Sequence, residues 1–168
     1  MAVTLTKPLH KTHINIDDDT RVKLIDQLNN ALAALIDLKL QVKQAHWNVK
    51  GMRFIALHEL FDLLASEVDK HIDKIAERAT TLGGVALGTI DSVKSTSVLP
   101  PYPIDALTGE DHLYALIDRY ALASNLMRKH IEDADNLGDA VTTDLYTETS
   151  SALDLRLWFL EAHIQDKV

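Results

Sequence analysis

The chain has 168 residues, of which 46% are hydrophobic and 25% charged, a composition typical of one globular domain with a substantial core. It has no cysteine, which excludes disulfides, thiolate metal sites and cysteine nucleophiles, and its formal net charge of −8 disfavours binding to polyanions. No apolar run is long enough to span a membrane and the N-terminus lacks an apolar signal core, so we expect a cytoplasmic protein without a membrane partner.

The N-terminal segment lacks a sustained hydrophobic stripe, and we expect an arm over 1–19 in front of one helical domain over 20–168. The first helix of that domain is predicted over about 20–49, because apolar residues recur there in alternating steps of four and three. The acidic run 17–19 favours a helix N-terminus, and Gly51 favours the end of the helix.

The second helix is predicted over 54–82, and Gly83 and Gly84 follow it as residues that tolerate the backbone of a helix end. Its apolar stripe consists of Leu57, Phe61, Leu64, Val68, Ile72, Ile75, Ala79 and Leu82. Four metal-type ligands on the same helix centre about 130° from this stripe on an ideal helix. We therefore expect these ligands to lie outside the chain's own core.

The four ligands form two i,i+4 pairs, His58 with Asp62 and Asp73 with Glu77. The two pairs share a helix face but lie about 16 Å apart along the axis, which is farther than one ion can bridge. An antiparallel copy of the helix, related by a two-fold axis, would bring His58 and Asp62 of one chain against Asp73 and Glu77 of the other. The spacing therefore predicts a symmetric metal site between subunits.

A solvated, charged helix face without metal is the alternative interpretation of the same residues. Lys70 and Lys74 each lie three residues before an acid and could neutralise it. In favour of a metal, Asp69, Asp73 and Glu77 form a like-charge i,i+4 ladder, which costs stability unless a cation offsets it.

A long connection over 85–107 follows the second helix, and its three prolines forbid a continuous helix, although 90–95 could form one short helical turn. Two further helices are predicted over about 110–136 and 139–165. The predicted inner face of the last helix consists of Leu145, Ala152, Leu155, Phe159 and Ala162. Short, long and short loops between four helices predict an all-α, ferritin-like four-helix bundle with a long crossover that contains a short helix.

Several short motifs carry further information. They are Lys43-Gln44-Ala45-His46-Trp47-Asn48, His58-Glu59-x-x-Asp62, Asp73-x-x-x-Glu77-Arg78-Ala79, Leu82-Gly83-Gly84-Val85-Ala86-Leu87-Gly88-Thr89, Tyr102-Pro103, Asp118-Arg119-Tyr120-Ala121 and Leu157-Trp158-Phe159-Leu160-Glu161. Together they resemble the Dps family, the miniferritin branch of the ferritin-like proteins, over everything except the arm. The Glu-x-x-His motif of ordinary ferritins occurs nowhere, so we expect no internal di-iron site of that kind.

The resemblance implies ferroxidase activity with iron as the substrate. It assigns the iron ligands His46, His58 and Asp62 to one subunit and Asp73 and Glu77 to its two-fold mate. It also implies a homo-oligomer, a hollow dodecameric shell that stores ferric mineral, with hydrogen peroxide as the preferred oxidant. Imidazole and carboxylate ligands suit iron in both oxidation states, and zinc could compete for them.

Two weaker assignments concern residues around the site. Trp47, next to a ligand, could quench a stray one-electron oxidant, although plain packing at a helix end is the interpretation that the sequence favours. In the family, the junction of the last two helices lines a pore on a three-fold axis. Asp135, Asp139 and Asp144 are our candidates for a carboxylate ring that concentrates ferrous ions there, and a charged turn is the alternative.

The main rival function is a DNA-binding nucleoid protein with secondary iron binding. The arm has only Lys7 and Lys11 as cationic side chains against three acids, so we expect DNA binding to be weak or absent at neutral pH. Protonation of His10 and His13 below about pH 6.5 could change this. A structural bundle without metal is the third alternative, and the five matched ligands disfavour it.

Overall fold

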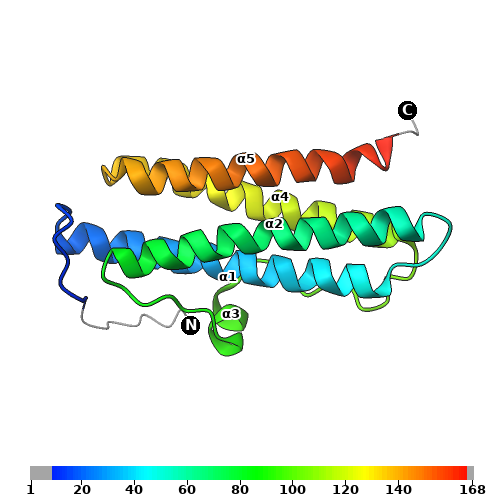
Figure 1. The fold of residues 1–168 in the computed structure, drawn as a ribbon, viewed down its shortest axis with the longest axis horizontal. Helices are drawn as coiled ribbons and strands as arrows, with labels where there is room; N and C mark the ends of the chain where they lie inside the picture. Colours follow the sequence, from blue (N-terminus) through cyan, green and yellow to red (C-terminus); the bar gives the residue numbers. More distant parts are fainter. Residues whose placement is uncertain (1–8, 166–168) are drawn as a thin grey trace.

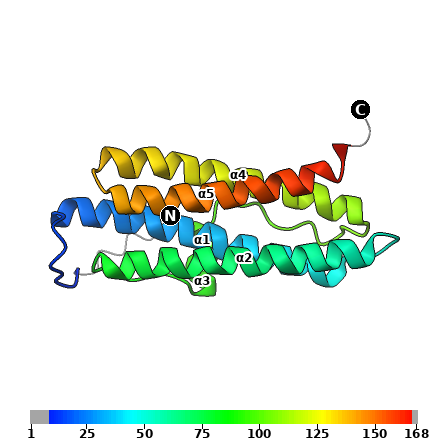
Figure 2. The same cartoon turned by 45° about the horizontal axis from the view of Figure 1, so that its top comes forward.

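The computed structural model describes residues 9–165, which form an all-helical bundle without a strand in that range. Its helices are α1 (Asp18–Asn48), α2 (Phe54–Thr81), α3 (Ile90–Thr96), α4 (Gly109–Asn136) and α5 (Ala140–Ala162). The helix α1 lies along α2, α4 lies along α5, and the two pairs stack side by side, as Figures 1 and 2 show. The short α3 lies in the long crossover and packs beside α1. The predicted fold class is confirmed.

The helix ends follow the predicted capping chemistry. The Asp17 side chain accepts a hydrogen bond from the Thr20 amide at 3.0 Å and caps α1. At α4, Thr108 and Asp111 form a reciprocal capping box. Gly83, after α2, has a φ of +87°, and a Cβ there would meet the His10 carbonyl oxygen at 2.5 Å, so glycine is required at this position.

The segment before α1 is non-helical over 9–17, and it joins the bundle where the His10 amide donates to the Gly83 carbonyl at 2.8 Å. The buried Arg21 guanidinium donates to the Leu82 carbonyl at 2.9 Å beside this contact. His10, Lys11 and His13 are exposed, whereas residues 1–8 of the predicted arm, including Lys7, lie outside the described residues.

The predicted core face of α2 is confirmed. The stripe residues Leu57, Phe61, Leu64, Val68, Ile75, Ala79 and Leu82 are all buried, and Ile72 is partly buried against the same core. None of the described helices is long and apolar enough to cross a membrane.

The predicted inner face of α5 is wrong in part: Leu145 packs against the core and Ala152 and Phe159 are partly buried, but Leu155 and Ala162 are exposed. Its buried residues are Thr142, Tyr146, Thr149, Ser150, Leu153 and Leu160, whereas the side chain of Leu155 is 46% exposed. The physical reason is that a threonine or serine hydroxyl can be buried when it donates a hydrogen bond to a backbone carbonyl of its own helix. Thr149 does this, since its hydroxyl donates to the Leu145 carbonyl at 2.8 Å. A pattern that counts threonine and serine as polar assigns the wrong face.

Candidate metal centre

His46 and His58 face each other across the turn between α1 and α2. His46 lies in the last turn of α1 and His58 near the start of α2, and their rings stack with centroids 3.8 Å apart. Each Nδ1 lies 2.8 Å from the backbone carbonyl oxygen of the other histidine. Because a carbonyl oxygen can only accept, each Nδ1 carries a hydrogen. Nε2 is therefore the nitrogen that each ring has left for a metal ion.

Asp62 lies one turn after His58 and adds a carboxylate to the two imidazoles. Its Oδ1 is 3.9 Å from the Nε2 of His46 and 2.7 Å from the Nζ of Lys43. The hydrogen bond from Lys43 lowers the pKa of the Asp62 carboxyl, which keeps it ionised, and its side chain remains 62% exposed. Sequence reasoning missed Lys43. Its spacing of three residues before His46, on one helix face, is the signal that could have found it.

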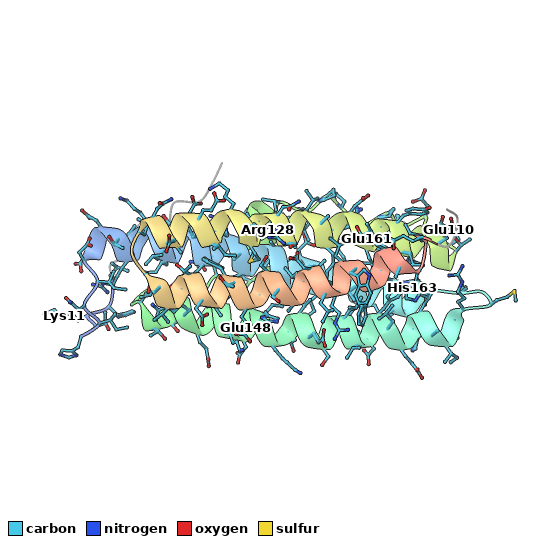
Figure 3. All side chains as sticks on the ribbon, turned by 90° about the horizontal axis from the view of Figure 1, so that it is seen from above. Lys11, Glu110, Arg128, Glu148, Glu161 and His163 are labelled. Atoms are coloured by element: carbon cyan, nitrogen blue, oxygen red, sulfur yellow. The ribbon has the colours of Figure 1, made fainter. Side chains whose placement is uncertain are left out.

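Asp73 and Glu77 lie toward the other end of α2, and both are exposed. Lys74, the predicted neutralising partner of Glu77, instead donates to Glu148 on α5 at 2.6 Å, and Figure 3 shows Glu148 on the side of α5 that faces α2. Within residues 9–165 no cluster of three or more histidine and acidic side chains could hold a metal ion. His58 and Asp62 lie in the first third of α2 and Asp73 and Glu77 in its last third, so the two pairs stay apart within one chain.

Trp47 and His71 lie near the candidate ligands but in different environments. The Trp47 side chain is 65% exposed, and the Lys43 Nζ lies 5.6 Å from the centroid of its ring, so packing inside this chain does not account for it. His71 accepts from or donates to the Thr149 hydroxyl at 3.2 Å, on the side of α2 that faces α5. It is therefore turned away from the ligand face, as its helical phase predicts.

The three pore candidates differ in environment. Asp135 and Asp144 are exposed at the junction of α4 and α5. Asp139 is only 4% exposed, caps α5, and binds the Thr142 hydroxyl and the Arg78 guanidinium, the latter at 2.7 Å. Burial alone would raise the pKa of Asp139, but the hydrogen bonds from Thr142 and Arg78 lower it on balance, and the ion pair neutralises the charge that an ion-attracting carboxylate needs. Its environment argues for a structural role.

Comparisons with known proteins identify the family of the chain. The ferritin-like domain family matches residues 25–167. The "DNA protection during starvation protein" of Agrobacterium fabrum is 49% identical over 158 residues, which cover 94% of this chain and 98% of that protein.

Solved structures give the same answer. DpsA14 from Streptomyces coelicolor superimposes with a TM-score of 0.90 and 34% identity, covering 95% of this chain and 94% of that one. The tetragonal form of Mycobacterium smegmatis Dps superimposes with a TM-score of 0.88 and 31% identity, covering 97% and 96% of the two chains. From its sequence, its fold and these relatives, the chain belongs to the Dps family of ferritin-like proteins.

Proposed function

We propose that this protein is a ferroxidase that oxidises ferrous iron, preferentially with hydrogen peroxide, at sites shared between two-fold-related subunits. The observation that carries the proposal is the placement of two candidate ligand sets, with His46 of α1 beside His58 and Asp62 of α2, and with Asp73 and Glu77 exposed farther along α2. Ferric product would be stored as mineral in a hollow dodecameric shell, and removal of iron and peroxide together would protect the cell against oxidative damage.

The roles of the ligands follow from their chemistry. His46, His58 and Asp62 of one subunit would bind ferrous iron, with Asp73 and Glu77 of the two-fold mate completing the site. Carboxylate oxygens bind the harder ferric ion more strongly than the ferrous ion, so this ligand set favours oxidation. Two ferrous ions, one peroxide and two protons would give two ferric ions and two water molecules. The paired electrons avoid release of hydroxyl radical.

Neighbouring residues would tune the site rather than ligate iron. Lys43 would hold the Asp62 carboxylate ionised until an entering cation displaces its ammonium group. Trp47 remains our candidate for quenching stray oxidants next to His46. Zinc would compete for the same ligands, since imidazole and carboxylate groups bind it well. Asp135 and Asp144 are the stronger candidates for an ion-entry pore, because Asp139 is neutralised by Arg78.

DNA binding is the second candidate function, suggested by the name of the Agrobacterium relative. The charge of −8 and the exposed acids at 17–19 oppose it near neutral pH. We expect no shifted band in a gel-shift assay at neutral pH and low salt. A shift under those conditions would support the nucleoid function.

Anaerobic loading with ferrous iron, followed by peroxide, tests the ferroxidase function through the absorbance of ferric product and the ratio of iron oxidised to peroxide consumed. We expect a ratio near two in the parent protein. The double variant His58→Ala/Asp62→Ala should oxidise iron on the order of a hundredfold more slowly, while the shell stays intact, because the core stripe is untouched. Glu59→Ala, on an exposed neighbour between the two ligands, is the matched control. Parental rates in the double variant would reject the assignment.

A further inference from the structure

A hydrogen-bonded tyrosine–histidine pair lies outside the ligand set of α2. The Tyr102 hydroxyl, in the crossover, lies 2.6 Å from the Nδ1 of His112, near the start of α4, and the two rings are nearly parallel with centroids 6.0 Å apart. His112 is 1% exposed, and this burial lowers the pKa of its imidazole, although the Asn48 carbonyl and the Asp111 carboxylate oppose the shift. The ring is therefore neutral near pH 7, and its Nδ1 can accept the phenol hydrogen.

The other tyrosines of the chain lack such a base. The hydroxyls of Tyr120 and Tyr146 are buried, and neither has a hydrogen-bond partner among the described residues. His130 lies beside Tyr146 with ring centroids 5.2 Å apart, yet neither of its ring nitrogens makes a hydrogen bond within that range. Tyr114 is 48% exposed, and no hydrogen bond is formed by its hydroxyl within the described part of the chain. Within residues 9–165, Tyr102 is the one tyrosine that combines a phenol with an acceptor for its proton.

The proton acceptor decides which tyrosine can lose an electron. A phenol that has lost one electron is a very strong acid, so its oxidation is far easier when a neighbouring base takes the proton at the same time. Transfer of the proton to His112 gives a neutral tyrosyl radical and an imidazolium. Burial also raises the pKa of the Tyr102 phenol, so it holds its proton until it is oxidised.

The pair has access both to solvent and to the metal-binding end of α1. The Tyr102 ring lines a hollow of about 340 Å³, together with Gln41 and Leu99. On its inner side, His112 lies close enough to the Asn48 carbonyl for that group to influence its pKa, and Asn48 is two residues beyond the ligand His46 in α1. Tyr102 thus lines a recess of the surface, and His112 adjoins the end of α1 that carries His46.

We propose that Tyr102 and His112 form a proton-coupled one-electron donor that removes hydroxyl radical when a site holds a single ferrous ion. This inference rests on the proposed ferroxidase function. One ferrous ion reduces peroxide to hydroxide and hydroxyl radical. Tyr102 gives one electron to the radical, which becomes hydroxide, and the phenol proton passes to the Nδ1 of His112. A second ferrous ion then reduces the tyrosyl radical, and the proton returns from His112 to the phenol oxygen.

The sum of these steps balances. Two ferrous ions and one peroxide give two ferric ions and two hydroxide ions, and two protons from solvent convert the hydroxide to water. The pair thus stores one oxidising equivalent until the second ferrous ion arrives. The Arg119 guanidinium, whose carbon lies 5.8 Å from the centroid of the Tyr102 ring, raises the potential of the radical and favours its reduction by ferrous iron.

The test uses assembled protein in two arms, both read by electron paramagnetic resonance after freezing. In the first arm, one ferrous ion per site is followed by peroxide. In the second arm, which contains no iron, photogenerated ruthenium(III) tris-bipyridine is the oxidant. We expect a tyrosyl signal in both arms for the parent and for Tyr114→Phe, the matched control. Tyr102→Phe should lose it, and His112→Gln, which retains a hydrogen-bond acceptor but not a base, should give a smaller yield.

The outcomes separate this inference from the ferroxidase proposal. A parental tyrosyl yield in Tyr102→Phe or in His112→Gln would overturn the inference, as would ferric product in the first arm without a Tyr102 radical. A Tyr102 radical in the iron-free arm, with no ferric product in the first arm, would reject the ferroxidase function while retaining the pair as an electron donor.

Discussion

The helix pairs α1–α2 and α4–α5 bury different kinds of side chain against the core of the bundle. On α2, the buried face is entirely apolar, and the opposite face carries the exposed carboxylates Asp62, Asp73 and Glu77. On α5, threonine and serine enter the interior, while Leu155 and Trp158 are 46% and 58% exposed. When the apolar and polar faces of a helix are separated, as on α2, the hydrophobic pattern predicts which residues are buried and which are exposed. When polar residues are also buried, as on α5, the same pattern does not predict which face of the helix packs inside.

The interior between α4 and α5 is also less completely hydrogen-bonded. His130 and Tyr146 are buried there, and their polar side-chain atoms have no partner within residues 9–165. By contrast, the histidines between α1 and α2 both use their Nδ1 atoms. The α4–α5 pair therefore buries polar groups without hydrogen bonds, and the protonation of His130 makes the cost of that burial depend on pH.

The largest effect tests the orientation of α5 directly. Leu153 is 2% exposed, and Leu155, two residues later, is 46% exposed. Leu153→Ala should lower the free energy of unfolding by about 2–5 kcal/mol, because it leaves a cavity in the core. Leu155→Ala should cost less than about 1 kcal/mol. Urea unfolding at matched subunit concentration measures both. If the Leu155 variant lost as much stability as the Leu153 variant, the observed register of α5 would be contradicted.

A comparable effect should appear when His130 is titrated. Burial lowers the pKa of His130 from 6.5 to about 4. Below pH 6.5 the unfolded chain binds a proton that the folded chain does not bind, so stability is lost as the pH falls from 6.5 to 4. The full loss is on the order of 3 kcal/mol.

The control for this titration is the variant His130→Phe, which keeps a ring beside Tyr146 but cannot bind a proton. Unfolding free energies of parent and variant, measured at several pH values, should diverge below pH 6.5 and run parallel above it. Parallel curves over the whole range would show that His130 is not kept neutral by the fold.

The smallest effect concerns Lys43 in the other helix pair. Lys43→Met removes the ammonium group that competes with a metal ion for Asp62, so anaerobic ferrous binding should become tighter at neutral pH, by less than about tenfold because the pair is exposed. Lys39→Met is the matched control, since Lys39 donates to Asp69, which is not a ligand, at 2.5 Å. Calorimetry of both variants measures the difference. Equal affinities for ferrous iron in the two variants would mean that Lys43 does not compete with the metal ion for Asp62.

The sequence predicted the fold, and it predicted that the candidate ligands of α2 are exposed outside the core, because both depend on local periodicity. The helix ends were predicted to within a few residues, and the phase of His58, Asp62, Asp73 and Glu77 on α2 needed only the geometry of one helix. The spacing of residues alone did not decide between a metal site and a solvated face, because Lys74 could have neutralised Glu77. In the structure Lys74 pairs with Glu148, which is remote in the sequence, so this pairing could not be predicted from local spacing.

The features that were missed depend on long-range contacts. Neither the reciprocal hydrogen bonds of His46 and His58 nor the contact of Tyr102 with His112 has a periodic signal, because each forms only when separate helices pack. The pairing of Asp139 with Arg78 joins residues from α2 and the start of α5, so a cluster of acids in the sequence did not show which carboxylate is neutralised.

The central claim is that each iron site takes ligands from two chains, and mixed assembly tests it most directly. One variant lacks His58 and Asp62, and a second lacks Asp73 and Glu77. Each alone should form shells with almost no peroxide-driven iron oxidation, since every site loses part of its ligands. At a two-fold interface between the two variants, one site receives both damaged sets and the other receives both intact sets.

Verified mixed shells should therefore recover activity, up to about half of the sites at each mixed interface. The rate of ferric product formation after addition of peroxide, compared among the two homomeric shells, the mixed shell and the parent, is the measurement. Recovery in the mixed shell alone is the predicted result. Absence of recovery in shells shown to contain both variants would contradict the shared site, even if the parent protein oxidises iron.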